Sequence, residues 1–365
     1  MQMSNAVAHD GFATMMALIE AFARRSAHRI FDELPRWFLG HDNRFYWVYL
    51  LSFVILGVFA YRRYYRGTGA PGSNRGLLRF LFPPEVYRHP SAIIDYQLVL
   101  MNRLLGPAAL LAGLFLGSAS VTAVAQLTQH ALADLAGGQV SQLEWTFRTS
   151  LLFALGITVV QDFTTFVTHG LSHRVPLLWE FHKVHHSAAV LTPLTVNRKH
   201  PVYNLLGRAV DLAVVGPVQG LFAFLFVGQA EPVTLFGANI VFSLFHLAGA
   251  NLRHSHIWLP FGQRLSHVFI SPAQHQIHHS MAPRHWNKNF GEVFAVWDWL
   301  CGTLYVPSRE REVLEFGIPG SARDEHSTLL KVYFVPFINC VYLLQRYLHA
   351  DARDEVAVPL DSQRE

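Results

Sequence analysis

The chain has 365 residues, of which 51% are hydrophobic and only 15% are charged. A soluble domain usually carries roughly 25% charged residues, so this composition excludes an ordinary water-soluble enzyme and favours a membrane protein. The net charge of +4 comes mainly from arginines that flank apolar runs, which indicates contact with a membrane surface and not with nucleic acid. The two cysteines, Cys301 and Cys340, form no CxxC pair, so we expect neither a disulfide framework nor a cysteine-ligated cluster.

The apolar segments predict an all-α integral membrane protein with a bundle of about four to five transmembrane helices. Residues 1–44 form a mixed N-terminal segment without a clear secretory signal. In chain order, spanning helices are expected at residues 46–61, 98–127, 149–167, 209–227 and 233–250, with a polar connection at 128–147 and a tight hairpin between the last two. An apolar stretch at 329–348, interrupted by Pro336, predicts an interfacial helix or a packed amphipathic one, and residues 351–365 form a polar tail.

The distribution of arginines orients these helices. Six arginines lie in residues 62–97 and no lysine or arginine lies in 128–147, so the positive-inside bias places the first loop in the cytoplasm. Counting helices onward brings two histidine-rich segments, 169–200 and 254–285, to the same cytoplasmic face. We therefore predict a cytosolic helical cap that holds a shared, histidine-rich di-metal site.

Histidine spacing carries the chemistry. Of 21 histidines, fourteen lie between His169 and His285. Eight of them form one HxxxH and two HxxHH motifs, namely His169 and His173; His182, His185 and His186; and His275, His278 and His279. Residues three and four apart share one face of a helix, so each motif presents its imidazoles in one direction. Facing imidazoles are costly to desolvate, and metal coordination is the compensation that we expect.

Eight nitrogens exceed the roughly four to six ligands that one metal takes, so two metals are predicted. Imidazole suits iron, zinc, copper and nickel, and the ligand type alone leaves the metal open. The chain has no HExxH motif, which argues against a zinc protease. Asp162 lies two turns before His169 on the same helix face, where we expect it to accept a ring N–H and fix a tautomer.

Several longer motifs resemble those of one known family. They are the run from Asp162 to His173, Leu178-Trp179-Glu180-Phe181-His182, Arg198-Lys199-His200-Pro201, Ser271-Pro272 before His275, Asn289-Phe290-Gly291, and Trp297-Asp298. Over about residues 85–310 the sequence resembles the fatty acid hydroxylase/sterol desaturase superfamily, in a sterol-desaturase-like bacterial branch. The resemblance implies an iron-dependent oxidoreductase with two irons, which acts with O2 on a lipid C–H bond. The reaction would be hydroxylation or a desaturation like that of C-5 sterol desaturases, on a sterol, a hopanoid, a fatty acyl chain or a related lipid.

The resemblance also extends the list of site residues. It implies a further ligand between the two HxxHH motifs, and His254 is chosen because Pro260 and Gly262 follow it. Ligand and supporting roles stay open for a second group: His200, His246, His256, His285 and Asn289. The corresponding domain division is a segment 1–44, a catalytic domain 45–310, an apolar or interfacial helix region 311–350 and a tail 351–365.

The chain shows no haem, flavin, iron–sulfur or dinucleotide motif. Electrons would therefore come from a separate donor, a ferredoxin or a cytochrome b5-like protein with its reductase, docking on the basic cytoplasmic face. Arginine-rich, lysine-poor usage favours a bacterial source. Together with the predicted spanning helices, it predicts a multi-pass protein of the bacterial inner membrane. The competing interpretation is a non-enzymatic membrane metal transporter or sensor. Transporters place ligands near the bilayer midplane, whereas these motifs are expected just past the ends of the helices.

Overall fold

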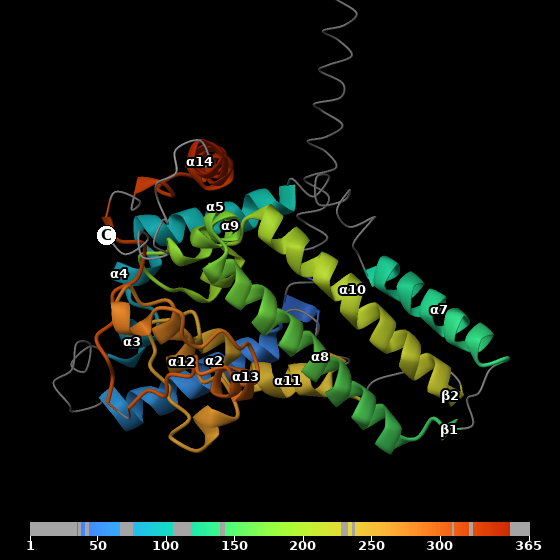
Figure 1. The fold of residues 1–365 in the computed structure, drawn as a ribbon. Coiled ribbons are helices and arrows are strands. Elements are labelled where there is room, and N and C mark those ends of the chain that lie inside the picture. The colour runs from blue at the N-terminus through green and yellow to red at the C-terminus, as the bar shows by residue number, and fades with distance from the viewer. Residues whose placement is uncertain are drawn as a thin grey trace, which may run out of the picture.

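The computed structural model describes residues 35, 38–40, 44–65, 76–104, 118–138, 143–227, 233–235, 238–308, 310–320 and 324–350. These residues are mostly helical, as the sequence predicts (Figure 1). The predicted tail 351–365 and nearly all of the predicted segment 1–44 lie outside the described residues.

The α-helices are α2 (Trp47–Ala60), α3 (Leu77–Leu81), α4 (Pro84–Tyr87), α5 (Pro90–Leu104), α7 (Ser118–Leu135), α8 (Phe147–Arg174), α9 (Pro176–His186), α10 (Pro201–Leu225), α11 (Ile240–Leu247), α12 (Pro272–His278), α13 (Val296–Leu300) and α14 (Leu329–Ala350). Short helical turns are η1 (Tyr61–Tyr65), η2 (Pro193–Asn197), η3 (Ala250–Leu252), η4 (Leu265–His267) and η5 (Pro283–His285). Two-residue strands also form, β1 (Leu143–Glu144) parallel to β2 (Phe226–Val227) and β3 (Thr234–Leu235) antiparallel to β4 (Ala238–Asn239).

Helices α7, α8 and α10 form an arm that extends away from the compact part of the molecule (Figure 1). Within it, α7 and α8 each pack against α10. A Cβ on Gly216 would lie 2.8 Å from Val124 Cγ1, and a Cβ on Gly220 would meet the carbonyl oxygen of Ala125. These two glycines, four residues apart, let the backbones of α7 and α10 approach closely, as small residues do between membrane helices.

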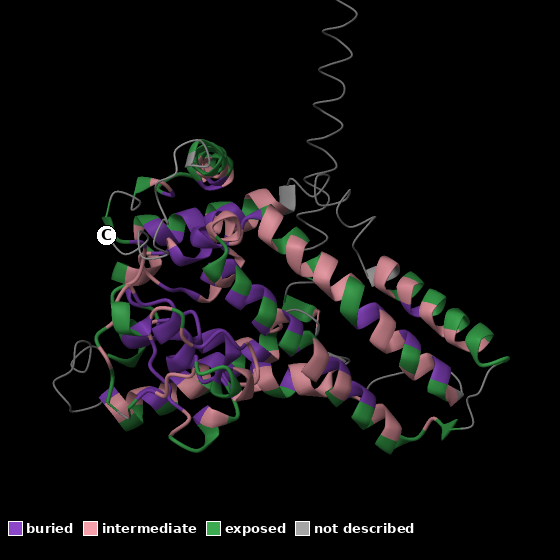
Figure 2. Ribbon diagram, viewed as in Figure 1, coloured by how far each residue is buried: buried purple, intermediate pink, exposed green. Residues whose placement is uncertain are grey.

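The compact part contains most of the buried residues (Figure 2). One core cluster includes Phe53 of α2, Trp258, and Ala273 and Ile277 of α12. Ala273 and Ile277 are four residues apart and so share one face of α12. Burying a side chain such as Ile277 stabilises the fold by about 1.5–3 kcal/mol. The apolar face of α12 is thereby fixed on the core, and its histidines are turned to the opposite side.

Two described helices, α8 and α10, are long and apolar enough to cross a membrane. The predicted span at 149–167 corresponds to α8, which is longer and continues through His169 and His173. The expectation that the histidine motifs lie just past the helix ends is therefore wrong for this pair, which occupies the last two turns of α8. Helix α10 covers most of the predicted span 209–227 and begins eight residues earlier, at Pro201.

Of the other predicted spans, one is not a single helix and one is only partly described. The segment 233–250 holds β3, β4 and the eight-residue α11, which is only about 12 Å long, so the second arm of the predicted hairpin is not a spanning helix. The middle of the span 98–127 lies outside the described residues, with α5 before it and α7 after it. Helix α7 continues to Leu135, so the first part of the predicted polar connection is helical.

Candidate metal centre

All nine predicted ligands lie in two groups of buried or half-buried imidazoles. In each group the candidate ligand atoms lie within 4.8 Å of one another. Group A is His169, His173, His182, His186 and His278, and group B is His185, His254, His275 and His279. Helix α8 contributes only to group A and the loop after η3 only to group B. Both HxxHH motifs contribute to both groups, which could not be read from the spacing alone.

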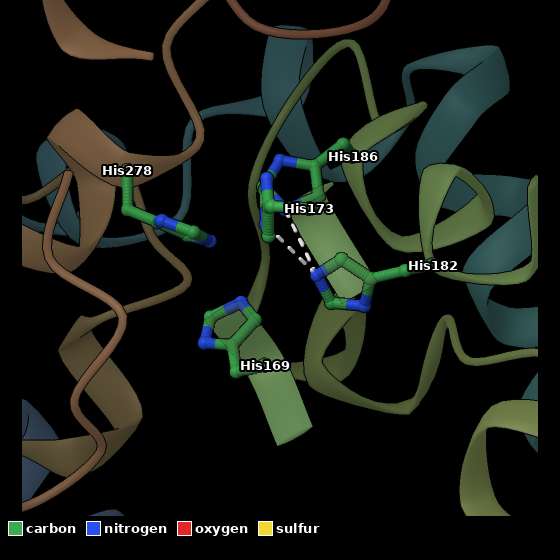
Figure 3. A group of neighbouring side chains, drawn as sticks. All are labelled: His169, His173, His182, His186 and His278. Carbon is green, nitrogen blue, oxygen red and sulfur yellow. Dashed lines mark hydrogen bonds between the residues drawn. The ribbon is translucent and has the colours of Figure 1, made fainter. Parts of the chain in front are cut away.

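Group A gathers around a common point between three helices (Figure 3). The Nε2 atom of His182 lies 3.1 Å from Nε2 of His173 and 3.2 Å from Nε2 of His186. His278 approaches from α12, on the other side of the group (Figure 3). Nitrogens bonded to one metal at about 2.1 Å and at right angles would be about 3.0 Å apart, so these separations fit ligands of a single ion.

Group B has the same spacing. Nε2 of His254 lies 3.2 Å from Nε2 of His185 and 3.0 Å from Nε2 of His275. Nε2 of His279 lies 3.2 Å from Nε2 of His275. The two groups touch, because the rings of His186 and His279 stack with centroids 4.6 Å apart. The structure thus contains two adjacent nitrogen-rich sites that are in direct contact.

Backbone carbonyls orient two of the rings. The carbonyl of Phe290 accepts a hydrogen bond from Nδ1 of His169 at 2.8 Å, and that of Lys288 accepts one from Nδ1 of His278 at 2.8 Å. The proton on Nδ1 leaves the lone pair on Nε2. Both Nε2 atoms are buried in group A without a hydrogen-bond partner among the described residues. Unpartnered lone pairs aimed at one point are what a metal would satisfy.

Burial favours the neutral form of the imidazoles in both groups. It lowers the pKa of the α9 and α12 histidines well below the usual range, and neighbouring histidines, Arg253 and Lys199 lower it further. Burial likewise lowers the pKa of His254, with His279 as the next cause. A neutral imidazole is the form that binds a metal. The donor set therefore fits metal ions, and its chemistry alone admits iron, zinc, copper or nickel.

Two buried carboxylates hold the loop that carries the Phe290 carbonyl. Asp298 accepts hydrogen bonds from the backbone N–H groups of Phe290 at 2.8 Å and Gly291 at 2.7 Å. Asp162 accepts from the backbone N–H groups of Val293 at 2.6 Å and Phe294 at 3.0 Å, and from Nε1 of Trp297 at 2.8 Å. The predicted contact between Asp162 and a histidine ring is therefore wrong: Asp162 acts on the loop, and the loop orients His169.

Asn289 belongs to the same support. Its side chain donates to the carbonyl of Gln274 at 3.0 Å and accepts from the backbone N–H of Tyr305 at 2.8 Å. It joins α12 to the following loop, and its φ of 59° lies in the left-handed region, where asparagine is better tolerated than most residues. Gly291 is required nearby, because a Cβ would meet the carbonyl oxygen of Phe294.

The four other histidines left open by the sequence lie outside both groups. Nε2 of His200 donates to the carbonyl of Tyr333 at 3.1 Å, and its Nδ1 caps α10 by accepting from the Val202 N–H. His256 bonds the carbonyl of Phe80 at 2.6 Å, and His246 donates from Nδ1 to the carbonyl of Phe242 at 2.9 Å. His285 lies 3.2 Å from Glu312. None of them is placed as a ligand of either group.

Sequence reasoning missed the charged side chains around the site. The guanidinium of Arg253 lies 3.1 Å from Nδ1 of His275 and donates to the carbonyl of Gly291 at 3.3 Å. Arg198 forms a buried ion pair with Asp95 at 2.9 Å and donates to the carbonyl of Val184 near the end of α9. Their positions in the sequence could have pointed to both arginines. Arg253 directly precedes the predicted ligand His254, and Arg198 stands in one of the motifs that resemble the family.

Comparison with known proteins supports this picture. Residues 154–303, which contain both groups, match the fatty acid hydroxylase family. The chain is 29% identical to an ornithine lipid hydroxylase of Rhizobium tropici over 56% of each protein. It is 26% identical to an alkylglycerol monooxygenase of Caenorhabditis elegans over 46% of this chain and 29% of that protein. Identity to human cholesterol 25-hydroxylase is 30%, over 43% of this chain and 52% of that protein. No solved structure gives a significant match.

The fold and the two touching groups of buried imidazoles define a helical protein with a candidate site for two metal ions. Within that class, residues 154–303 match the fatty acid hydroxylase family, and the relatives are lipid hydroxylases and monooxygenases. The match covers about half the length of the first relative and less of the second.

Proposed function

We propose that this chain is a membrane-bound, di-iron lipid hydroxylase that uses O2. The observation that carries the proposal is the convergence of group A and group B within the region that matches the fatty acid hydroxylase family. The nine histidines would be the ligands, with Asp162, Asp298 and Asn289 in supporting roles. Iron is favoured over the other metals that imidazole binds because residues 154–303 match this family.

Membrane placement is supported by the surface. Large apolar side chains are exposed along α2, α8, α10 and α14, far more than a monomeric soluble protein usually exposes. Helices α8 and α10 would cross the bilayer. The arginine-rich loop at 62–97 supports a cytoplasmic location for the two groups, and we propose a multi-pass protein of a bacterial inner membrane.

Iron bound at the two groups would supply O2 activation for attack on an unactivated C–H bond, with electrons from a ferredoxin or a cytochrome b5-like protein and its reductase. The protein's own residues hold and orient the ligands. Phe290 and Lys288 fix the tautomers of His169 and His278 through their carbonyls. The nearly complete burial of the ligands excludes bulk water from the site, which protects a reactive centre from side reactions.

Hydroxylation is favoured over desaturation by the names of the relatives, which are hydroxylases and monooxygenases of an ornithine lipid, of alkylglycerols and of cholesterol. We propose a lipid substrate of the same broad kind. A transporter or sensor is disfavoured because each group is closed by ligands from at least three separate segments of the chain.

The test is oxygen incorporation into lipid. Cells that express the chain with a ferredoxin and its reductase are grown under isotopically heavy oxygen gas, and extracted lipids are analysed by mass spectrometry. We expect a lipid that gains one labelled oxygen atom, and we expect none with His185→Ala or His278→Ala. Labelled product that persists in both variants would contradict the proposal.

A further inference from the structure

A small cavity of about 50 Å³ opens directly in front of the two groups. Five of the clustered histidines line it, together with four charged side chains: Arg44, Lys199, Arg253 and Glu292. An apolar lipid chain placed here would have to strip these charges of water without replacing their hydrogen bonds. The lining therefore does not suit a saturated acyl chain alone.

A second cavity of about 330 Å³ continues from the first along α8. The two share Arg44, Thr165 and Glu292 in their linings. The larger cavity has apolar walls but also polar side chains, among them Asn239 and His246, and Nε2 of His246 is buried without a partner among the described residues. A polar group that enters the larger cavity therefore reaches Arg44, which lies where the larger cavity meets the small one.

Positive charge prevails in the small cavity, where three cations face one carboxylate. Among the described residues no ion pair within 4.0 Å joins any two of the four, and Nε of Arg253 has no hydrogen-bond partner. Lys199 lies over the ring of Tyr203 at 5.7 Å. Burial raises the pKa of Glu292, but Arg253, Lys199 and Arg44 outweigh burial and lower it below the usual value. Glu292 is thus a counter-charge that leaves cationic donors in excess.

The larger cavity does not reverse this excess. Its second carboxylate, Asp162, already accepts three hydrogen bonds from the loop at 293–297. Arg44 therefore remains the charged donor at the junction. Guanidinium groups bind carboxylate and phosphate oxygens by strong, paired hydrogen bonds.

We propose that Arg44, with Lys199 and Arg253 behind it, binds an oxyanion in the polar head of the lipid substrate. The head group occupies the larger cavity, and the oxidised carbon lies close to the head group and not far along the acyl chain. This inference rests on the proposed function, because it names the substrate class of the same site. A carboxylate and a phosphate ester share the required chemistry, and the experiment separates them.

The test is equilibrium binding of radiolabelled lipids to the full, iron-loaded chain in non-ionic detergent with O2 excluded. The three probes carry the same acyl chain: palmitate, palmitoyl lysophosphatidate and neutral palmitoylglycerol. We expect at least one anionic lipid to bind about tenfold more tightly than the neutral one. Arg44→Gln should remove that preference, and Arg44→Lys, which keeps the charge without the paired hydrogen bonds, should keep part of it. Arg208→Gln, on the exposed side of α10, is the matched control and should bind as the parent does.

Equal affinities for all three lipids would overturn the proposal, as would a preference that survives in Arg44→Gln. Iron content, measured in every variant, shows that the centre is intact. Tandem mass spectrometry of the labelled product then locates the new oxygen, which we expect within a few carbons of the head group. A lipid oxidised without anionic preference would remove this inference and leave the proposed function. Anionic preference without any lipid oxidation would remove the proposed function.

Discussion

The loop that carries the Phe290 carbonyl offers a quantitative test through Asp298→Asn. Asp298 is fully buried, and its Oδ1 accepts from the N–H of Phe290 at 2.8 Å and from Oγ1 of Thr303 at 2.6 Å. Its Oδ2 accepts from the N–H of Gly291 at 2.7 Å. An asparagine has almost the same shape but only one oxygen, so it can accept at one of these two positions.

The least costly arrangement keeps the amide oxygen at the Oδ1 position. The amide NH2 then faces the Gly291 N–H, and this buried donor loses its partner at a cost of about 1–3 kcal/mol. The displaced loop carries the carbonyl that holds His169. Loss of such an outer partner typically lowers metal affinity about 10- to 100-fold, so we expect weaker iron binding together with lower stability.

The assay is competition for iron between the purified chain and a chelator, followed by thermal unfolding in detergent. Asp134→Asn is the control, because Asp134 is an exposed carboxylate on α7, far from the loop in sequence. An Asp298→Asn protein that retains iron against chelator as well as the control would refute the role assigned to this loop.

Three further tests address other parts of the site. Asp162→Asn should lower iron retention in the same direction, because an amide there leaves at least one of three loop donors unpaired, measured by the same chelator competition. His285→Ala should keep its iron whereas His278→Ala should lose iron, as metal analysis would show. Arg198→Met should destabilise the chain by about 3–5 kcal/mol, because Asp95 is left buried without its partner, and a lower unfolding midpoint would show it.

Each of these has a defined contrary result. Unchanged iron retention in Asp162→Asn would return that residue to a purely structural role. Iron loss in His285→Ala matching that in His278→Ala would make His285 part of the centre. For the ion pair, the double change Arg198→Met with Asp95→Leu should recover part of the lost stability; no recovery would mean that Arg198 acts through its other hydrogen bonds.

Much of the candidate site follows from helical periodicity. Side chains three and four residues apart share a face, so the HxxHH spacing predicted that each motif would turn its imidazoles toward one common region. The division into two groups depends on how closely α9 approaches α12, which is set by packing. Asp162 shows the same limit. Its position relative to His169 was correct along the helix, but its partners are Val293, Phe294 and Trp297, over 130 residues away.

The membrane spans show what hydropathy measures. Residues 233–250 are apolar, and hydropathy alone predicted a spanning helix. In the structure Asn239 caps α11 by accepting from the Val241 N–H, and Gly249 stops it by adopting a φ of 98°. Apolar composition indicates that a segment is removed from water. It does not determine how many of its residues form one continuous helix. By contrast, α8 has a capping box at Thr146 and no such interruption.

The central claim is that two metal ions occupy groups A and B. The most direct measurement is the metal content of the chain purified without chelator and reconstituted with ferrous iron in the absence of O2, by elemental analysis with Mössbauer spectroscopy. The account predicts two irons per chain in nitrogen-rich sites, and loss of iron when either His185 or His278 is replaced by alanine. A single iron per chain, or an iron content unchanged in both variants, would contradict it.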